Sequence, residues 1–208
     1  MLRVIAFATM AIDHIGAIFF PQFLIFRIIG RLAFPLFAYG VAQGYSRTRN
    51  FSNYSQRILV LGLISQPIFY LLFKSDYINI CFSLLLGLLA IYTYDKVKKY
   101  IWKILGIGVL LFLAYFLKVE YGIYGVLMIL FFYIFRNNPW LLIFQALLVF
   151  SYVLLDYARF LSIFALPAFF LAYYFKKYDF RINRAVQYLF YPVHLLIIYL
   201  IYIFKNFY

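Results

Sequence analysis

The sequence is poor in the residues that cover the surface of a water-soluble protein. Charged residues make up 12% of the 208 positions, and only six of them are acidic. Hydrophobic residues make up 68% and aromatic residues 25%, so a soluble fold of this size would lack enough polar surface to cover its core. The composition therefore predicts an integral membrane protein.

Cysteine is nearly absent, since Cys81 is the only one in the chain. A single thiol can build neither a disulfide framework nor a clustered thiolate metal site. Alternation of polar and apolar residues, which marks the strands of a membrane barrel, is also missing, because the apolar runs are continuous. These absences leave a bundle of membrane helices as the expected architecture.

The apolar runs follow one another almost without interruption, and each is about as long as a helix that crosses the hydrocarbon core. We expect an all-α polytopic bundle of about nine transmembrane helices, in a single domain that covers residues 1–208. The predicted segments are 2–20, 23–45, 56–73, 78–94, 101–117, 119–135, 139–155, 159–175 and 186–204.

The net charge of +13 comes mostly from short connectors, which offer no exposed groove for nucleic acid. Cytoplasmic connectors of membrane proteins collect Lys and Arg. With the nine segments, 13 basic residues fall on the side of the amino terminus and four on the other. We therefore predict a multi-pass protein of the cell (inner, cytoplasmic) membrane, with its amino terminus in the cytoplasm and its carboxyl terminus outside. The eighth connector contributes Lys176, Lys177, Arg181 and Arg184 to this count.

Five ionisable residues lie well inside the predicted segments: Asp13, His14, Arg27, Arg31 and His194. Each is costly to bury, by about 3 kcal/mol for a charged residue at a helix centre, so each needs a partner or a watery cavity. Only two residues separate the first two segments, so these segments form a hairpin. At about 1.5 Å per residue, Asp13 reaches the depth of the two arginines, and we predict an ion pair between Asp13 and one of them.

His14 follows Asp13 directly, and consecutive residues of a helix point about 100° apart. If Asp13 faces the arginines, His14 faces elsewhere, and His194 in the last segment lies at a similar depth. Two histidines at one depth are a candidate acid–base or proton-relay pair. Tyr191, three residues before His194 and on the same helix face, is an accessory donor in this interpretation. We expect no metal, because Asp13 already has arginine partners and no further ligand is at hand.

Other polar and small residues have simpler explanations. Gln43, Gln66, Asn79 and Gln145 are expected to form hydrogen bonds between helices, and the Gly40–Gly44 pair is expected to allow close helix packing.

Three stretches together resemble a known family: "IDHIGAIFFP", "FRIIGRLAFPLFAYGVAQGYSRTRN" followed by "LISQPIF", and the terminal "YPVHLLIIYLI". They resemble the TraX family of membrane proteins, whose namesake N-acetylates a pilin. The resemblance implies a transmembrane acetyltransferase with acetyl-CoA as the donor substrate. The acceptor would be an amine, such as the amino terminus of a pilin or another exported peptide.

Transfer of an acetyl group to an amine needs a base and a donor that stabilises negative charge. We assign His14 as the base and His194 as its alternative or relay partner. Arg27 or Arg31, oriented by Asp13, would stabilise charge or hold the pantetheine arm. Arg47 and Arg49 would receive the CoA phosphates, unless they are simply basic residues of a cytoplasmic connector.

Two other functions use the same residues. The first is a proton-coupled transporter, in which Asp13 and the histidines form a relay, although no internal repeat of the kind common in transporters is visible. The second is a non-enzymatic assembly factor of a surface or conjugation apparatus.

Overall fold

A computed structural model describes residues 1–175 and 183–207, and within these ranges the chain is helical with no β-strand. The predicted all-α bundle is confirmed, and helices occupy each of the nine predicted segments. Lys176, Lys177 and Arg181 of the predicted cytoplasmic count lie outside the described residues. The helices are α1 (Leu2–Phe19), α2 (Leu24–Gly30), α3 (Ala33–Arg47), α4 (Phe51–Phe73), α5 (Ile80–Lys96), α6 (Tyr100–Phe116), α7 (Gly122–Ile134), α8 (Trp140–Leu155), the 3₁₀-helix η1 (Tyr157–Ala165), α9 (Leu166–Tyr174) and α10 (Arg184–Phe207).

Four helices are long and apolar enough to cross a membrane: Leu2–Phe19, Leu24–Arg47, Phe51–Phe73 and Ala185–Asn206. The outer surface of the bundle is apolar as well, with Leu154 86% exposed and Leu155 80% exposed. An apolar surface of this kind suits hydrocarbon better than water, so the chain is a transmembrane helix bundle.

The second predicted segment is interrupted, and the break falls at Arg31 and Leu32, between α2 and α3. Pro35 has no amide hydrogen, and its ring would clash with the Arg31 carbonyl four residues earlier in a continuous helix. Gly30 also lowers helix propensity at this point. Amide bonds to the carbonyls three residues back, including one from Arg31 to Ile28, bridge the break. The predicted segment 23–45 is therefore one span that contains an irregular turn at Arg31 and Leu32.

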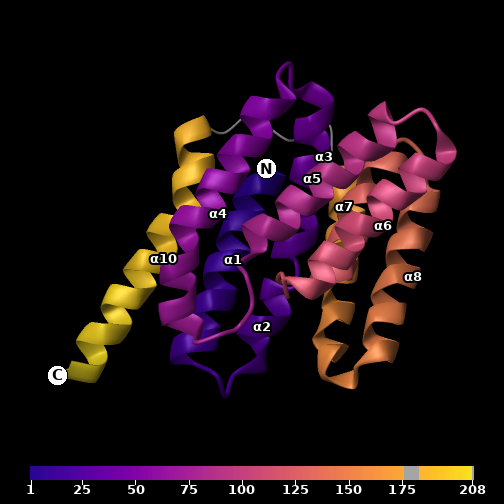
Figure 1. Cartoon of the computed structure of the whole chain (residues 1–208). Helices are drawn as coiled ribbons and strands as arrows, with labels where there is room; N and C mark the ends of the chain where they lie inside the picture. The colour runs from indigo at the N-terminus through magenta and orange to yellow at the C-terminus, as the bar shows by residue number, and fades with distance from the viewer. Residues whose placement is uncertain (176–182, 208) are drawn as a thin grey trace.

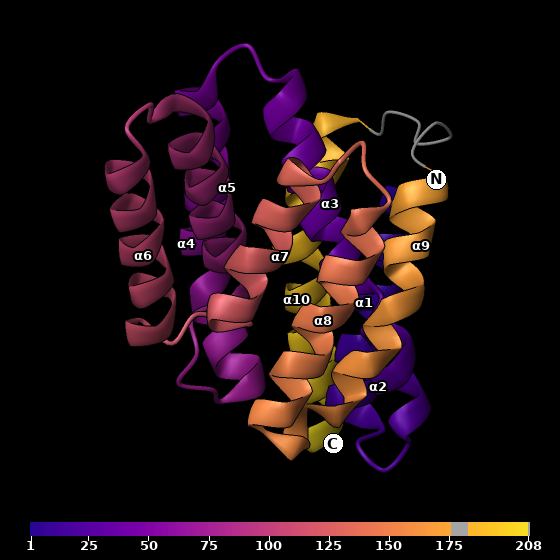
Figure 2. The same ribbon diagram turned by 90° about the vertical axis from the view of Figure 1, so that its right-hand side faces the viewer.

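The helices form a bundle in which α1 and α3 lie near the middle (Figure 1). Helices α10 and α4 pack on one side, and α5, α6, α7 and α8 extend away on the other. The connectors 48–50, 97–99 and 135–139 lie at one end, and the connectors that follow α1 and α8 lie at the opposite end (Figure 2). The two chain termini lie at opposite ends of the bundle.

The first two helices approach each other closely because two glycines face the contact. A Cβ atom on Gly16 would lie 2.1 Å from Cβ of Phe26, and one on Gly30 would lie 2.0 Å from Oδ1 of Asp13. No side chain fits at either position. Gly30 thus leaves the space that the Asp13 carboxylate occupies.

Two connectors return toward the middle of the bundle instead of ending at its rim. The chain rises from the lower end of α4 to the start of α5, and the α6–α7 connector lies at a similar height (Figure 1). A single parallel bridge between Ile78 and Val119 joins the two connectors. The amide of Glu120 also donates to the carbonyl of Ile78 at 2.8 Å. Connector residues are thereby placed at the depth of the helix centres.

Candidate functional site

Asp13 forms an ion pair with both arginines of the next helix. Its Oδ2 atom lies 2.7 Å from Nη1 of Arg27, and its Oδ1 atom lies 3.4 Å from Nη2 of Arg31. Arg31 also donates from Nε to the Arg27 carbonyl at 3.3 Å, which satisfies an acceptor at the end of α2. The Asp13 side chain is 13% exposed. The predicted ion pair is present, and the carboxylate engages two guanidinium groups instead of one.

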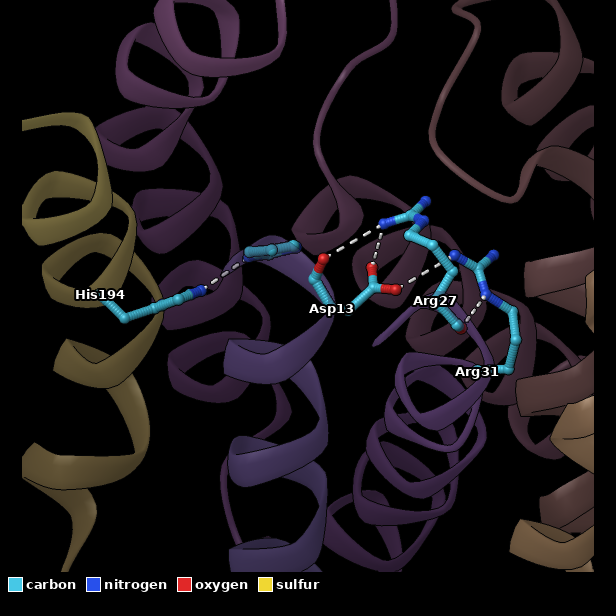
Figure 3. A network of polar contacts seen from close by, with 5 residues as sticks. Asp13, Arg27, Arg31 and His194 are labelled. Atoms are coloured by element: carbon cyan, nitrogen blue, oxygen red, sulfur yellow. Dashed lines mark hydrogen bonds and ion pairs between the residues drawn. The ribbon is translucent and has the colours of Figure 1, made fainter. Parts of the chain in front are cut away.

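His14 turns away from this cluster and contacts His194. Nδ1 of His14 lies 2.8 Å from Nε2 of His194, with the two rings 9° from parallel. Nδ1 of His194 lies 2.8 Å from the carbonyl oxygen of Phe190. In Figure 3 Asp13 separates the His194 side of the network from Arg27 and Arg31. Residues 180 positions apart in the sequence therefore meet at one depth, as the sequence predicts.

The hydrogen bonds fix which nitrogens carry protons when both rings are neutral. A carbonyl oxygen only accepts, so Nδ1 of His194 donates to Phe190 and its Nε2 is an acceptor. Nδ1 of His14 must then donate to Nε2 of His194. This leaves Nε2 of His14 as the unprotonated nitrogen, and no residue in 1–175 or 183–207 forms a hydrogen bond with it. The pair therefore presents one free basic atom, on His14.

A cavity of about 430 Å³ lies between α1, α3, α4, α5 and α10. This volume is within the usual range for a small-molecule site. Apolar side chains form most of its wall, among them Phe7, Leu36, Phe37, Ile58 and Leu61. The cavity is thus suited to a narrow, mostly apolar chain.

Arginines surround one end of the cavity. Arg3, Arg47 and Arg57 line it there, together with Tyr54 and Tyr188. Arg57 donates from Nε to the hydroxyl of Tyr188 at 3.1 Å, which ties α4 to α10. The side chains of Arg47 and Arg57 are exposed, so this end is the mouth of the cavity. A concentration of guanidinium groups at a mouth favours an anionic ligand.

Not all of the predicted phosphate-binding residues reach the mouth. Arg47 lines the cavity, whereas Arg49 is exposed on the connector between α3 and α4 and is not part of the lining. Arg3 and Arg57 do line it, and the sequence interpretation missed both. A basic residue of a connector cannot be assigned to a cavity until the helices that form the cavity are placed side by side.

The other end of the cavity stops one helical turn from the histidine pair. Met10 and Tyr191 line the cavity, and His14 and His194 follow them by four and three residues on the same helices. One turn is about 5.4 Å along a helix. The ring of Tyr191 lies 5.6 Å from that of His194, between ring centroids. The cavity therefore leads from the arginines at its mouth to the neighbourhood of the histidines.

Tyr191 carries an unsatisfied group at this inner end. The residue is 5% exposed, and its hydroxyl has no hydrogen-bond partner among the described residues. A buried hydroxyl without a partner costs about 1–3 kcal/mol, so such a group is often found where a ligand binds. The observation suits the predicted role of Tyr191 as an accessory donor, which stays a prediction.

The two glycines of α3 do not act together as a helix-packing pair. Both line the cavity, and a Cβ atom on Gly40 would meet no atom within 4 Å, whereas one on Gly44 would lie 2.4 Å from the hydroxyl oxygen of Tyr54. The close-packing interpretation was therefore wrong for Gly40, because its missing side chain widens the cavity.

The sequence interpretation also overlooked Glu120. This residue lies in the connector between α6 and α7, within electrostatic range of Arg31, Asp13 and Tyr191. The sequence predicts no further ligand near the site, although Glu120 lies close to the start of the predicted segment 119–135. The return of the connector toward the middle of the bundle brings it inward.

Gln66, Asn79 and Gln145 join helices as expected, but the expectation was wrong for Gln43, whose amide donates to the hydroxyl of Tyr39 within α3. The side-chain amide of Asn79 donates to the carbonyl of Gly62 and to Oε1 of Gln66, both at 2.8 Å. Gln145 donates to the carbonyl of Met128 at 3.0 Å. Within the described ranges, no group of three or more His, Cys, Asp or Glu side chains is arranged to hold a metal ion.

Comparison with known proteins identifies relatives of the chain. Over 142 residues it is 31% identical to a protein of Dichelobacter nodosus named "Probable fimbrial assembly protein FimC, serogroup H1". The aligned region covers 61% of this chain and 57% of that protein. Over 93 residues it is 36% identical to an uncharacterized protein of Rickettsia prowazekii (strain Madrid E), covering 44% and 36% of the two chains. The chain thus spans about half the length, or less, of the curated relatives it matches.

No solved structure matches the chain. The sequence profile of one family, described as TraX protein, matches residues 1–202, which is nearly the whole length. The chain therefore belongs to the TraX protein family, as its terminal motifs suggest.

Proposed function

We propose that the protein is an integral membrane acetyltransferase. It moves an acetyl group from acetyl-CoA to an amine acceptor, such as the amino terminus of a pilin or another exported peptide. The observation that carries this proposal is the cavity that begins at a group of arginines and ends one turn from a histidine with a free basic nitrogen. Membership of the TraX family and the similarity to a protein named for fimbrial assembly support the same conclusion.

The residues of the cavity suit acetyl-CoA by type and by position. Phosphates are anionic, and Arg3, Arg47 and Arg57 at the mouth are the partners they require. The pantetheine arm is narrow and mostly apolar, and Gly40 leaves room for it along α3. The acetyl end would then lie beside Tyr191, whose buried hydroxyl can donate to a carbonyl oxygen.

Acetyl-CoA supplies a thioester, whose carbonyl carbon is open to attack by an uncharged amine. An acceptor amine is mostly cationic at neutral pH, so it must first lose a proton. Nε2 of His14 accepts this proton, and the imidazolium that forms is stabilised by the hydrogen bond from its Nδ1 to His194. His194 is held in the accepting tautomer by the carbonyl of Phe190.

The remaining steps balance without any further reactant. The amine nitrogen forms a bond to the carbonyl carbon, and the carbon–sulfur bond breaks. The second proton lost from nitrogen goes to the departing thiolate, which gives the thiol of CoA and the N-acetylated acceptor. His14 releases the first proton to solvent, so the overall reaction yields one proton for each ammonium group consumed.

Arg27 and Arg31 have a structural role in this account. Both are engaged by Asp13, and they fix the α1–α2 hairpin that carries His14. The sequence interpretation, in which one of them stabilises the negative charge of the reaction, stays a prediction. Tyr191 is better placed for that purpose, since it lines the cavity and has no other partner.

The proposed orientation in the cell membrane follows from the donor. Acetyl-CoA is a cytoplasmic metabolite, so the mouth with its arginines would face the cytoplasm. The described basic connectors and the amino terminus lie at that same end of the bundle. This agrees with the expected cytoplasmic amino terminus, and the acceptor would approach from the other side.

The test is transfer of label from radiolabelled acetyl-CoA to a panel of peptides with free amino termini, with purified protein in detergent. We expect Gly40→Leu to raise the KM for acetyl-CoA by at least about tenfold, because the new side chain occupies open cavity space. Gly108→Leu is the matched control. A Cβ on Gly108 also meets nothing within 4 Å, but this glycine lies on the exposed face of α6, outside the cavity.

Equal effects of the two substitutions would contradict the use of this cavity by acetyl-CoA. Failure of the wild-type protein to label any acceptor, while it remains folded, would contradict the acetyltransferase proposal. In that case proton movement in sealed vesicles would distinguish the proton-coupled transporter from the assembly factor.

A further inference from the structure

Among the residues that the structure describes, Glu120 is the one carboxylate near the site that the proposed reaction leaves without a role. Its backbone is held firmly at the start of α5. The Glu120 amide donates to the Ile78 carbonyl at 2.8 Å, and its own carbonyl accepts a hydrogen bond from the hydroxyl of Ser83. The position of this residue is therefore set by two elements and does not depend on the connector alone.

The Glu120 side chain has two groups of neighbours. Arg31, Arg27 and Asp13 lie within electrostatic range of it, and so do Cys81 and Tyr191. Cys81 and Tyr191 both line the inner end of the cavity. Glu120 is thus near both the Asp13 ion-pair cluster and the residues at the inner end of the cavity.

The neighbouring arginines form ion pairs with Asp13 and not with Glu120. Asp13 engages both Arg27 and Arg31 within 4 Å, whereas no ion pair in the described part of the chain includes Glu120. Two arginines and two carboxylates balance in sum, but the Glu120 carboxylate has no cation in direct contact. A carboxylate inside a membrane bundle is costly unless a cation or a hydrogen-bond donor approaches it.

Tyr191 supplies the second, independent observation. Its hydroxyl is buried, lacks a hydrogen-bond partner and lies near Glu120. An ammonium group has three donor hydrogens and suits a site with a carboxylate and a hydroxyl oxygen. The Glu120 carboxylate lacks a cation in contact and the Tyr191 hydroxyl lacks a hydrogen-bond partner, and both groups are of the type that recognises a primary amine.

We infer that Glu120 binds the ammonium group of the acceptor, next to Tyr191 and opposite the acetyl donor. This inference rests on the proposed function, and it identifies the residue that selects amine acceptors. The cavity holds the donor, and Glu120 holds the acceptor on the other side of Tyr191. The carboxylate is a binding group here, while His14 accepts the proton.

The experiment compares two hexapeptide acceptors that differ only at the amino terminus. One begins with a free glycine amine, which is cationic at neutral pH. The other begins with an aminooxyacetyl group, which is a neutral nucleophile at that pH. Glu120→Gln should raise the KM for the glycine peptide by about 10- to 100-fold, because a hydrogen bond to a charged group is lost. The KM for the aminooxy peptide and that for acetyl-CoA should stay within about twofold of the wild-type values.

Two further variants separate binding from folding. Glu120→Asp keeps the charge and should recover part of the affinity for the glycine peptide. Asp76→Asn removes the same charge from an exposed position in the neighbouring connector, and should leave every KM unchanged. A merely structural role of Glu120 would change the KM for acetyl-CoA and for both peptides alike.

The outcomes separate this inference from the function on which it rests. If the wild-type protein acetylates the glycine peptide and Glu120→Gln does so with an unchanged KM, the role of Glu120 is refuted and the acetyltransferase stands. If the folded wild-type protein acetylates neither peptide, nor any other acceptor, both proposals are refuted.

Discussion

Asp13 and His14 are neighbours in the sequence, yet they lie in two regions of opposite character. The Asp13 region is saturated, since both carboxylate oxygens contact arginines and Arg31 also caps the end of α2. The His14 region is open, since a chain of two hydrogen bonds ends at a nitrogen without a partner. The roughly 100° between consecutive helix residues is what separates them.

The difference shows how to distinguish structural from chemical polar groups within a membrane bundle. A buried charged group whose ion-pair and hydrogen-bond partners are all within the protein contributes to folding and has no free atom with which to bind a substrate. A group with one unsatisfied atom next to a cavity retains that capacity. Substitutions in the first region should therefore change stability, and those in the second should change activity.

The largest expected effect on stability is that of Asp13→Asn. The substitution leaves two arginines inside the bundle without a carboxylate in direct contact, and it should lower the free energy of unfolding by about 3 kcal/mol or more. Thermal unfolding of the purified protein in detergent would show this as a clear decrease in Tm. Asp156→Asn is the control, because the Asp156–Arg159 pair is 45% and 38% exposed and should contribute less than about 1 kcal/mol. A Tm of Asp13→Asn equal to that of the control would refute the structural role of the cluster.

The second prediction concerns His14→Gln, which should retain its Tm within a few degrees. Loss of the base should decrease kcat for acetyl transfer by about 10²- to 10⁴-fold. Steady-state transfer of radiolabelled acetyl groups measures the change. If the His14→Gln variant keeps the kcat of the wild-type protein, His14 is not the base.

Substitutions of His194 test the same comparison, and we expect them to reduce acetyl-transfer activity less than His14→Gln does. His194→Gln keeps an acceptor for Nδ1 of His14, whereas His194→Leu does not. We expect the leucine variant to lose more activity than the glutamine variant, because only the latter holds His14 in the reactive tautomer. Equal activities of the two variants, measured in the same transfer assay, would count against the relay.

The smallest effect is expected at the mouth of the cavity. Arg47→Ala should weaken CoA binding by about fivefold, as expected for one exposed contact to a phosphate. Arg49→Ala should change it less, because Arg49 does not line the cavity. Protection from thermal unfolding by increasing CoA concentrations measures both affinities. If the connector binds the phosphates instead of the cavity, Arg49→Ala should weaken CoA binding more than Arg47→Ala does.

Much of the architecture follows from the sequence because the rise and twist of a helix are nearly constant. Apolar runs predict the nine segments, and depth along two helices predicts that Asp13 meets the arginines. The same arithmetic places His14 and His194 at one depth. Contacts between helices of known direction are thus accessible to simple geometry.

Other features depend on how the helices lie side by side and are not visible in a linear sequence. The cavity exists because α1, α3, α4, α5 and α10 surround it, so the assignment of Arg3, Arg57 and Gly40 needed the packed bundle. Glu120 was overlooked because its connector turns inward, which the length of an apolar run does not reveal. The break at Arg31 could have been predicted, since Gly30 and Pro35 both disfavour a continuous helix there.

The central claim is that the CoA arm occupies the cavity with its sulfur at the inner end, and Cys81 allows a direct test. Cys81 is the only cysteine of the chain and lines the cavity beside Tyr191. An activated disulfide of CoA should form a mixed disulfide with it, seen as one added CoA by intact-protein mass spectrometry. Acetyl-CoA should slow this reaction, because it competes for the cavity. Cys81→Ser should abolish the reaction, and Gly40→Leu should slow it. Modification of Cys81 by a small methanethiosulfonate, but not by the CoA disulfide, would contradict the account.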